Sequence, residues 1–235
     1  MEKIPLVLSP SQQSNNKCSV CASEASHMKL IFQELYNKFK LDDRFDVLLI
    51  PTLTGSDNDK LVQITTLSNN FVNKRKPAIH LSGHSDGGYK GTGASAFWYA
   101  DGGLGEKLGK EIFKKVCDLT PWSDMQSYAR PGLWELKETD ASAALIEVSF
   151  HDKIIEAQWI HNNVKSIANC FYLGTYAALG LEPFVPKDDN LILVEHMMKD
   201  SLITDKQGWY EIMQGKRPVP LEFFKIICQR AVDKI

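Results

Sequence analysis

The chain has 235 residues, of which 43% are hydrophobic and 24% are charged, a balance that is ordinary for a folded globular protein. This length accommodates one domain of about 150–200 residues and a small appendage. The formal net charge of −2 argues against a nucleic-acid partner, and no apolar run is long enough for an integral membrane segment.

The N-terminus does not carry the pattern of a secretion signal. After Met1, Glu2 and Lys3 only a few apolar residues follow, far fewer than the apolar core of a signal peptide. We therefore expect synthesis in the cytoplasm, so that a target outside the cell is reached by another route.

Strands and helices are predicted to alternate over residues 1–180. In chain order we expect a strand over 4–8, a polar loop over 12–23, a helix from Glu24, a strand over 45–50, a helix over 59–73, and a strand over 77–84 that runs into a turn over 85–88. A strand over 94–99, a helix over 104–116, short and long strands over 133–136 and 143–150, and a long helix over 155–178 follow. This alternation predicts an α/β fold with a mostly parallel central sheet flanked by helices.

The C-terminal part of the sequence has a different composition. Residues 181–189 contain two prolines and a charge cluster, which is typical of a linker. Residues 190–235 show helical periodicity over 191–198 and 221–232, but they are too few for a large core of their own. We expect a small helical module that packs on the main domain, self-associates or carries a binding surface.

The five cysteines are odd in number and dispersed. They are Cys18, Cys21, Cys117, Cys170 and Cys228. The Cys18-x-x-Cys21 pair has polar flanks and no second pair of the same spacing, so we interpret the cysteines as structural or incidental thiols. A redox pair or half of a zinc site is the alternative for Cys18 and Cys21.

Three polar stretches fall at the ends of predicted strands, over 9–13, 84–86 and 147–151. In sheets of this kind, ligands bind beyond the carboxyl ends of the strands. We therefore expect the side chains of these stretches to meet in one site.

Glu147 is a carboxylate inside the apolar strand over 144–150, where a charge is costly unless it is paired. Strand periodicity places Ile146 and Val148 on one face and Glu147 and His151 on the other. A Glu that opens from a sheet into a site with a metal or another ionisable group is a candidate general base. The alternative is a structural Glu paired with a Lys or a backbone N–H.

Glu24 at a helix start and His84 at a strand end are candidate metal ligands. Catalytic zinc usually takes three protein ligands and a water, whose proton a nearby Glu accepts. His80 points to the same side of the strand as His84 but lies about 13 Å away, at roughly 3.3 Å per residue. We expect His80 to be a satisfied core histidine or a support for the ligand.

Four short motifs follow one another along the chain: LSPS over 8–11, IHLSGHSD over 79–86, GTG over 91–93 and ALIEVSF over 144–150. Together they resemble the zinc-dependent N-acetylmuramoyl-L-alanine amidases of phage endolysins and bacterial autolysins. The similarity covers about residues 3–180. It implies a peptidoglycan hydrolase that uses Zn²⁺ and cleaves the amide between N-acetylmuramic acid and L-alanine.

The resemblance also implies roles for particular residues. By position, Glu24 is the carboxylate ligand of zinc, His84 is the second histidine ligand and Glu147 is the catalytic base. The first histidine ligand of the family is absent, because residues 9–13 read Ser-Pro-Ser-Gln-Gln. His151, which faces the same way as Glu147, is one replacement; Gln12 or Gln13 is another, although an amide oxygen is a poorer zinc ligand than imidazole.

We expect substrate contacts from Gln13, Ser85 and Asp86. Asp86-Gly87 stands where the family usually has Asn-Ala, so the acceptor is kept and the amide donor is lost. Two other functions stay open: a zinc peptidase that cuts the peptide stem, and a metal-free cell-wall-binding module. By the same resemblance the protein is an endolysin that acts on the cell wall after release, and residues 190–235 are a wall-targeting module or one that forms a homodimer.

Overall fold

The computed structural model describes residues 2–88, 91–123, 125–184, 206–214 and 216. The chain divides into two compact units, of which one ends at Phe184 and the other begins at Val185. In the second unit the structure describes helix α8 (Lys206–Met213). The helices expected over 191–198 and 221–232, and residues 185–189 of the expected linker, lie outside the described residues.

The first unit is built on one six-stranded sheet in the order β2-β1-β3-β6-β4-β5. Its strands are β1 (Ile4–Pro10), β2 (Phe45–Leu49), β3 (Ile79–Asp86), β4 (Ser95–Trp98), β5 (Gln126–Ala129) and β6 (Ser142–Phe150). Every neighbouring pair is parallel except β4 and β6. The predicted mostly parallel α/β fold is therefore confirmed.

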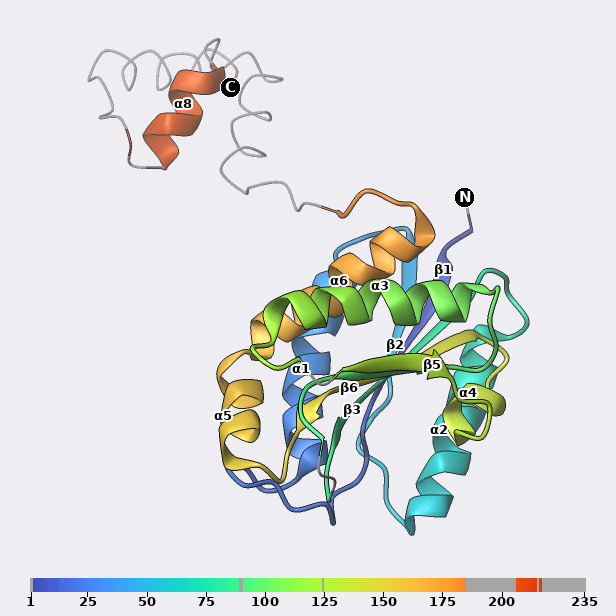
Figure 1. The fold of residues 1–235 in the computed structure, drawn as a ribbon. Coiled ribbons are helices and arrows are strands. Elements are labelled where there is room, and N and C mark those ends of the chain that lie inside the picture. Colours follow the sequence, from blue (N-terminus) through green and yellow to red (C-terminus); the bar gives the residue numbers. More distant parts are fainter. Residues whose placement is uncertain (1, 89–90, 124, 185–205, 215, 217–235) are drawn as a thin grey trace. The chain divides into compact units, whose positions relative to one another are not determined.

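Helices cover both faces of this sheet (Figure 1). The helices are α1 (Glu24–Phe39), α2 (Asp57–Val72), α3 (Leu104–Leu119), α4 (Trp134–Lys137), α5 (Ile154–Asn162) and α6 (Val164–Leu179). The larger core joins α1, α3 and α6 to one face, where Leu81 and Ile146 pack with Phe32. On the opposite face, smaller cores join Val7 to α2 and Leu145 to α4.

Helix α1 starts at Glu24 because the preceding residue caps it. The Ser23 side chain accepts a hydrogen bond from the backbone N–H of Ser26, whose side chain in turn accepts one from the Ser23 N–H. The apolar residues expected on one stripe, Met28, Ile31, Phe32, Leu35 and Phe39, are all buried. This cap fixes Glu24 at the first position of the helix, beside the strand ends.

Three local expectations were wrong. The strand expected over 133–136 is helix α4, and β5 was not expected at all. The single helix expected over 155–178 is divided into α5 and α6 at Asn163, whose side-chain amide donates to the Trp159 carbonyl at 2.8 Å. Such side-chain bonds compete with the backbone bonds of a continuous helix.

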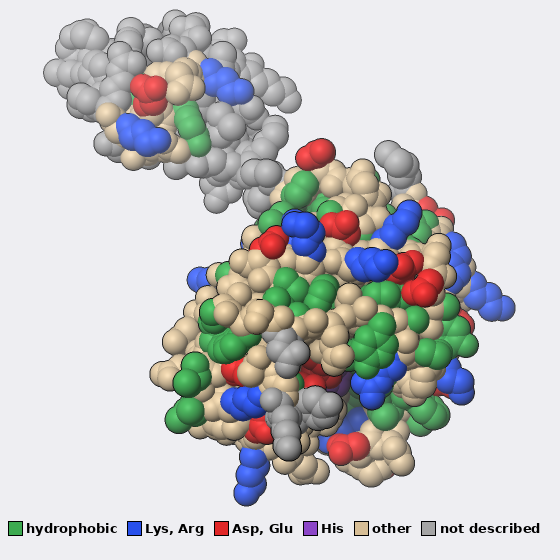
Figure 2. Space-filling view, in the orientation of Figure 1, with side chains coloured by type: hydrophobic (Ala, Val, Ile, Leu, Met, Phe, Trp, Pro, Cys, Tyr) green, Lys and Arg blue, Asp and Glu red, His purple; other side chains and the backbone are tan. Residues whose placement is uncertain are grey.

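The surface of the first unit carries both signs of charge. On the face that Figure 2 shows, Lys and Arg side chains are interspersed with Asp and Glu, so this face has no continuous basic patch. Among the helices that the structure describes, none is long and apolar enough to cross a membrane.

Candidate active site

The candidate site lies where β1, β3 and β6 end beside the start of α1. In the sheet register His84 of β3 is the partner of Glu147 of β6. A cleft of ≈ 630 Å³ opens there, and polar side chains dominate its lining. The lining includes Gln13, Asn16, Glu24, His84, Ser85, Asp86, Glu147 and His151. The structure thus brings the sequence-predicted site residues together, with the exception of Gln12.

Glu24 and His84 are in direct contact. Oε1 of Glu24 lies 2.8 Å from His84 Nδ1, and Oε2 accepts a hydrogen bond from Asn16 Nδ2 at 2.8 Å. The side chain of Glu24 is buried, and burial alone would favour its neutral form. The hydrogen bonds from His84, Ser11 and Asn16 outweigh burial and hold the pKa of Glu24 below its ordinary value.

Glu135 of α4 is a second buried carboxylate beside His84, and the sequence analysis missed it. Its Oε2 lies 2.8 Å from His80 Nε2 and accepts a hydrogen bond from Ser9 Oγ at 2.7 Å. Its Oε1 lies 3.6 Å from His84 Nε2. Burial opposes ionisation, but the hydrogen bond from His80 and the nearby imidazole of His84 hold the pKa of Glu135 well below its usual range.

The two histidines of β3 are therefore linked through one carboxylate. His80 is fully buried and also lies 3.0 Å, by its Nδ1, from Ser68 Oγ. Both ring nitrogens of His80 have partners, which agrees with the expectation of a satisfied core histidine. His84 lies between Glu135 and Glu24; burial disfavours its charged form, yet these carboxylates and the charge of Glu147 raise its pKa well above the ordinary value.

Glu147 faces the cleft with an unused oxygen. Its Oε2 is buried and has no hydrogen-bond partner among the described residues. Burial is the main cause that raises the pKa of Glu147 to about 8, and the negative charges of Glu24 and Asp86 add to it. His84 acts in the opposite direction.

His151 is held by the end of β3. Its Nδ1 lies 2.6 Å from the Ser85 carbonyl oxygen, so this nitrogen donates, and a Cβ at Gly87 would lie only 2.7 Å from its Nε2. His151 does not form a three-ligand group with Glu24 and His84. In the part of the chain that the structure describes, the group with three ligand atoms within 4.8 Å of one another is Cys18, Cys21 and His27.

The two glutamines after β1 point in different directions. Gln12 lines a separate cavity, where its Oε1 accepts a hydrogen bond from the Leu53 N–H at 3.0 Å. This placement does not support the expected ligand role of Gln12. Gln13 lines the cleft, and its Oε1 accepts a hydrogen bond from Asn16, the residue that also donates to Glu24.

Ser85 and Asp86 form the rim on the side of β3. The Ser85 N–H donates to Glu24 Oε1 at 3.4 Å, and Asp86 Oδ1 accepts from the Gly87 N–H at 2.7 Å. The rim of the cleft therefore contains a hydroxyl and a carboxylate.

The chemistry of this cleft fits a divalent cation. The carboxylates of Glu24, Glu135 and Glu147 act on the imidazole of His84, and the charge of Asp86 acts on Glu147. A buried carboxylate oxygen without a partner is costly, and a cation is one way to satisfy it. Glu24 and His84 already place an oxygen and a nitrogen side by side, although a catalytic zinc site usually has three protein ligands.

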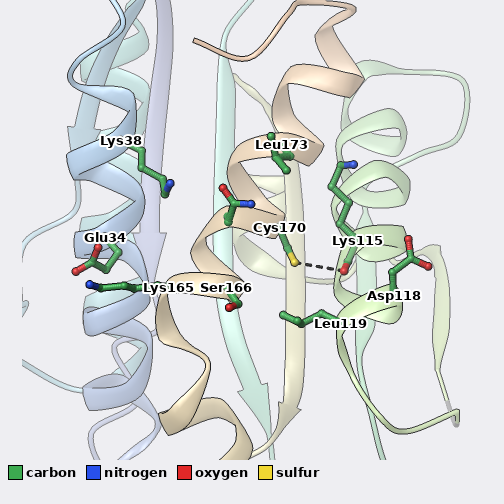
Figure 3. Close-up of a pocket in the computed structure, with 10 residues that line it drawn as sticks. Glu34, Lys38, Lys115, Asp118, Leu119, Lys165, Ser166, Cys170 and Leu173 are labelled. Atoms are coloured by element: carbon green, nitrogen blue, oxygen red, sulfur yellow. Dashed lines mark hydrogen bonds between the residues drawn. The ribbon is translucent and has the colours of Figure 1, made fainter. Parts of the chain in front are cut away.

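A third cavity, of ≈ 660 Å³, lies among α1, α3 and α6 (Figure 3). Lys38, Lys115 and Lys165 line it together with Glu34 and Asp118, so both signs of charge are present. No sequence-predicted site residue lines this cavity, and we assign the chemistry to the cleft at the strand ends.

No protein-family model and no curated protein matches the chain in sequence. Its fold, however, is that of solved N-acetylmuramoyl-L-alanine amidases, which confirms the predicted resemblance at the level of fold. The amidase from Clostridium difficile 630 is 18% identical with a TM-score of 0.65, over 77% of this chain and 98% of that one. The catalytic domain of the amidase CwlV from Bacillus (Paenibacillus) polymyxa is 14% identical with a TM-score of 0.63, over 77% of this chain and 100% of that one. The catalytic domain of an endolysin targeting Clostridia difficile is 17% identical with a TM-score of 0.58, over 77% of this chain and 99% of that one.

Proposed function

We propose that the protein is a peptidoglycan hydrolase that cleaves the amide between N-acetylmuramic acid and L-alanine and depends on a bound zinc ion. One observation carries the proposal: the contact between His84 Nδ1 and Glu24 Oε1 lies next to the unpartnered oxygen of Glu147, in a cleft at the strand ends. The amidase fold supports this assignment, because solved structures with the same fold are amidases of this bond.

Glu24 and His84 would hold the ion, through the carboxylate and through Nδ1. For Nδ1 to bind a cation it must be free of its proton, so the imidazole keeps its other proton on Nε2. That nitrogen faces the carboxylate of Glu135, which stabilises the required tautomer. When bound, zinc lowers the pKa of a water molecule to about 7 and polarises the carbonyl that is attacked.

Glu147 would act as the general base and then as the general acid. Its Oε2 has no competing hydrogen bond among the described residues. The positive charge of a bound cation would lower the raised pKa of Glu147, and the ionised carboxylate could then accept a proton from the attacking water. As the water oxygen bonds to the lactyl carbonyl carbon and the C–N bond breaks, Glu147 returns the proton to the alanine nitrogen. The products are a lactyl carboxylate and a free alanine amine.

The polar rim of the cleft would position the substrate. Gln13, Ser85 and Asp86 offer an amide, a hydroxyl and a carboxylate, which suit the hydroxyl and amide groups of a glycan with a peptide stem. Such contacts orient the scissile bond toward Glu147.

The test is a lysis assay on purified cell walls with identification of the products. The amidase reading requires new alanine N-termini without new reducing sugar ends, and loss of lysis with a chelator that zinc reverses. New N-termini within the peptide stem, with the lactyl amide intact, would instead identify a stem peptidase. Wall binding without any lysis, in the presence of zinc, would identify a metal-free binding module.

We further propose that the enzyme reaches the wall after release from the cell that makes it, and that residues 190–235 target the wall or form a homodimer. Comparing the full chain with residues 1–184 for binding to walls and for mass in solution tests this role. Equal wall binding and equal mass for both proteins would remove it.

A further inference from the structure

Cys18, Cys21 and His27 form a compact group that the proposed reaction does not use. Each offers one sulfur or nitrogen ligand atom, and these atoms all lie within 4.8 Å of one another. Cys18 and Cys21 are half-buried in the loop between β1 and α1, whereas His27 is fully buried in the first turns of α1. All three residues come from a short stretch of sequence, so local structure alone assembles the group.

The spacing of these atoms suits tetrahedral coordination. With Zn–S near 2.3 Å and Zn–N near 2.0–2.1 Å, the edge between a sulfur and a nitrogen ligand is about 3.5 Å. The Cys18 Sγ lies 3.7 Å from Nδ1 and 3.9 Å from Nε2 of His27. His161 of α5 adds a further imidazole beside the group, with its ring centroid 5.8 Å from that of His27.

The two sulfurs are joined as a disulfide in this structure. A thiolate is required for metal binding, so the disulfide and the metal-bound form exclude each other. A phosphine reductant converts the disulfide into two thiols. In this reaction the S–S bond breaks, and the phosphine takes up the oxygen of a water molecule to become phosphine oxide. These thiols lose their protons when a metal ion binds.

We propose that Cys18, Cys21 and His27 of the reduced protein form a second metal site, for a zinc-class divalent ion, separate from the pair of Glu24 and His84. Sulfur and imidazole ligands select such ions over magnesium or calcium. The site fixes the loop between β1 and α1. The same loop donates Asn16 to Glu24, and its Ser19 N–H donates to the His151 carbonyl at 2.9 Å.

Cobalt(II) is the probe that tests the site, because cobalt bound to thiolate absorbs in the near ultraviolet and thus reports sulfur ligation directly. The full chain carries Cys228→Ser, which removes the thiol outside the described residues, and is reduced with a phosphine without oxygen. We expect a thiolate band that saturates at one equivalent of sulfur-bound ion. Zinc abolishes the band by replacement, and oxidation by diamide, which takes up the two electrons and two protons of the thiols, removes it.

Variants assign the band to its ligands. We expect Cys18→Ser and Cys21→Ser each to remove the thiolate band, and His27→Gln to weaken cobalt binding at least tenfold. The control is Cys117→Ser, which changes a cysteine of α3 and should leave the band unchanged. Trypsin cleavage after the exposed Lys17 slows when zinc is added to the reduced parent but not to Cys18→Ser. A reduced parent without the band, or a band that survives in Cys18→Ser, overturns the proposal. Neither result bears on wall lysis, so this site and the amidase activity fail independently.

Discussion

Replacing Glu135 by Gln should weaken zinc binding without removing any ligand. The two oxygens of Glu135 have different partners: Oε2 serves His80 and Ser9, and Oε1 faces His84 Nε2 at 3.6 Å. In Glu135→Gln the amide oxygen keeps the two partners of Oε2, and the amide NH₂ then faces His84. An NH₂ group donates, so it favours a His84 tautomer with the proton on Nδ1, the nitrogen that must bind the ion.

The expected cost follows from the role of such carboxylates. Losing the group that orients a metal-binding histidine typically costs about 10–100-fold in metal affinity or activity, which is about 1.4–2.8 kcal/mol. Zinc affinity is measured by competition with a chromophoric chelator, and the rate of wall lysis is measured at saturating zinc. Circular dichroism and denaturant unfolding establish that the variant is folded.

A matched variant separates this effect from a general loss of charge on α4. Glu138 follows directly after α4 and pairs with Lys137 at 2.9 Å on the surface, so Glu138→Gln removes the same charge without touching His84. We expect unchanged zinc affinity for Glu138→Gln. A folded Glu135→Gln that binds zinc as tightly as the parent would refute the role assigned to Glu135.

Three further predictions concern the base, the pH dependence and the packing of the first unit. Glu147→Gln should lower the rate of lysis by about 10²–10⁴-fold, as for loss of a general base, with zinc still bound. The pKa of Asp42 lies below its ordinary value because the hydrogen bonds of Arg44 outweigh the effect of burial. The ionised carboxylate therefore stabilises the fold fully above the ordinary pKa, and this stabilisation is lost as the pH falls through the pKa of Asp42 in the folded protein. Asp42→Asn should therefore cost about 1.5–3 kcal/mol of unfolding free energy at pH 7, and the cost should shrink below about pH 4. Gly83→Ala should destabilise the fold by about 1–3 kcal/mol or more, because its Cβ would lie 2.0 Å from the Phe32 ring.

Each of these has a clear contrary result. Full lysis by Glu147→Gln would assign proton transfer to another group. A difference between parent and Asp42→Asn that stays constant from pH 7 to pH 3 would show that the carboxylate contributes nothing by its charge. Denaturant midpoints that coincide for Gly83→Ala and the parent would mean that the Phe32 ring moves aside without cost.

The sequence alone predicted that polar residues from several strand ends meet in one site, because this depends on the topology of the sheet rather than on side-chain detail. Parallel strands end at the same edge, so polar residues placed just after apolar runs meet there whatever the loops do. His84 and Glu147 were found in this way, whereas Glu24 was proposed from its place at a helix start and from the family resemblance. The start of α1 at Glu24 was also predicted, and the Ser23 cap explains it, since small polar residues favour that position.

The remaining parts of the site depend on details that a pattern does not contain. Residues 133–136 are too few to distinguish a strand from a helix by periodicity, and so the position of Glu135 could not be inferred. Strand parity placed His151 on the side of Glu147, but the pairing of β3 with β6 shifts register between His84 and Asp86. After such an irregularity, the alternation of side chains along the strand no longer predicts where a side chain lies. The position of His151 is set instead by its contact with the Ser85 carbonyl.

His84 receives its two carboxylates from opposite helical layers of the fold. Glu24 begins α1, which packs on the face of the large core, whereas Glu135 lies in α4, which packs on the opposite face through Leu136. The imidazole at the end of β3 therefore contacts Glu24 by Nδ1 and faces Glu135 by Nε2. Because each carboxylate is fixed by a different core, a packing change in either layer shifts one partner of His84 relative to the other. The orientation of the proposed metal ligand therefore depends on the packing of both helical layers, and its tautomer depends on the position of Glu135 in α4.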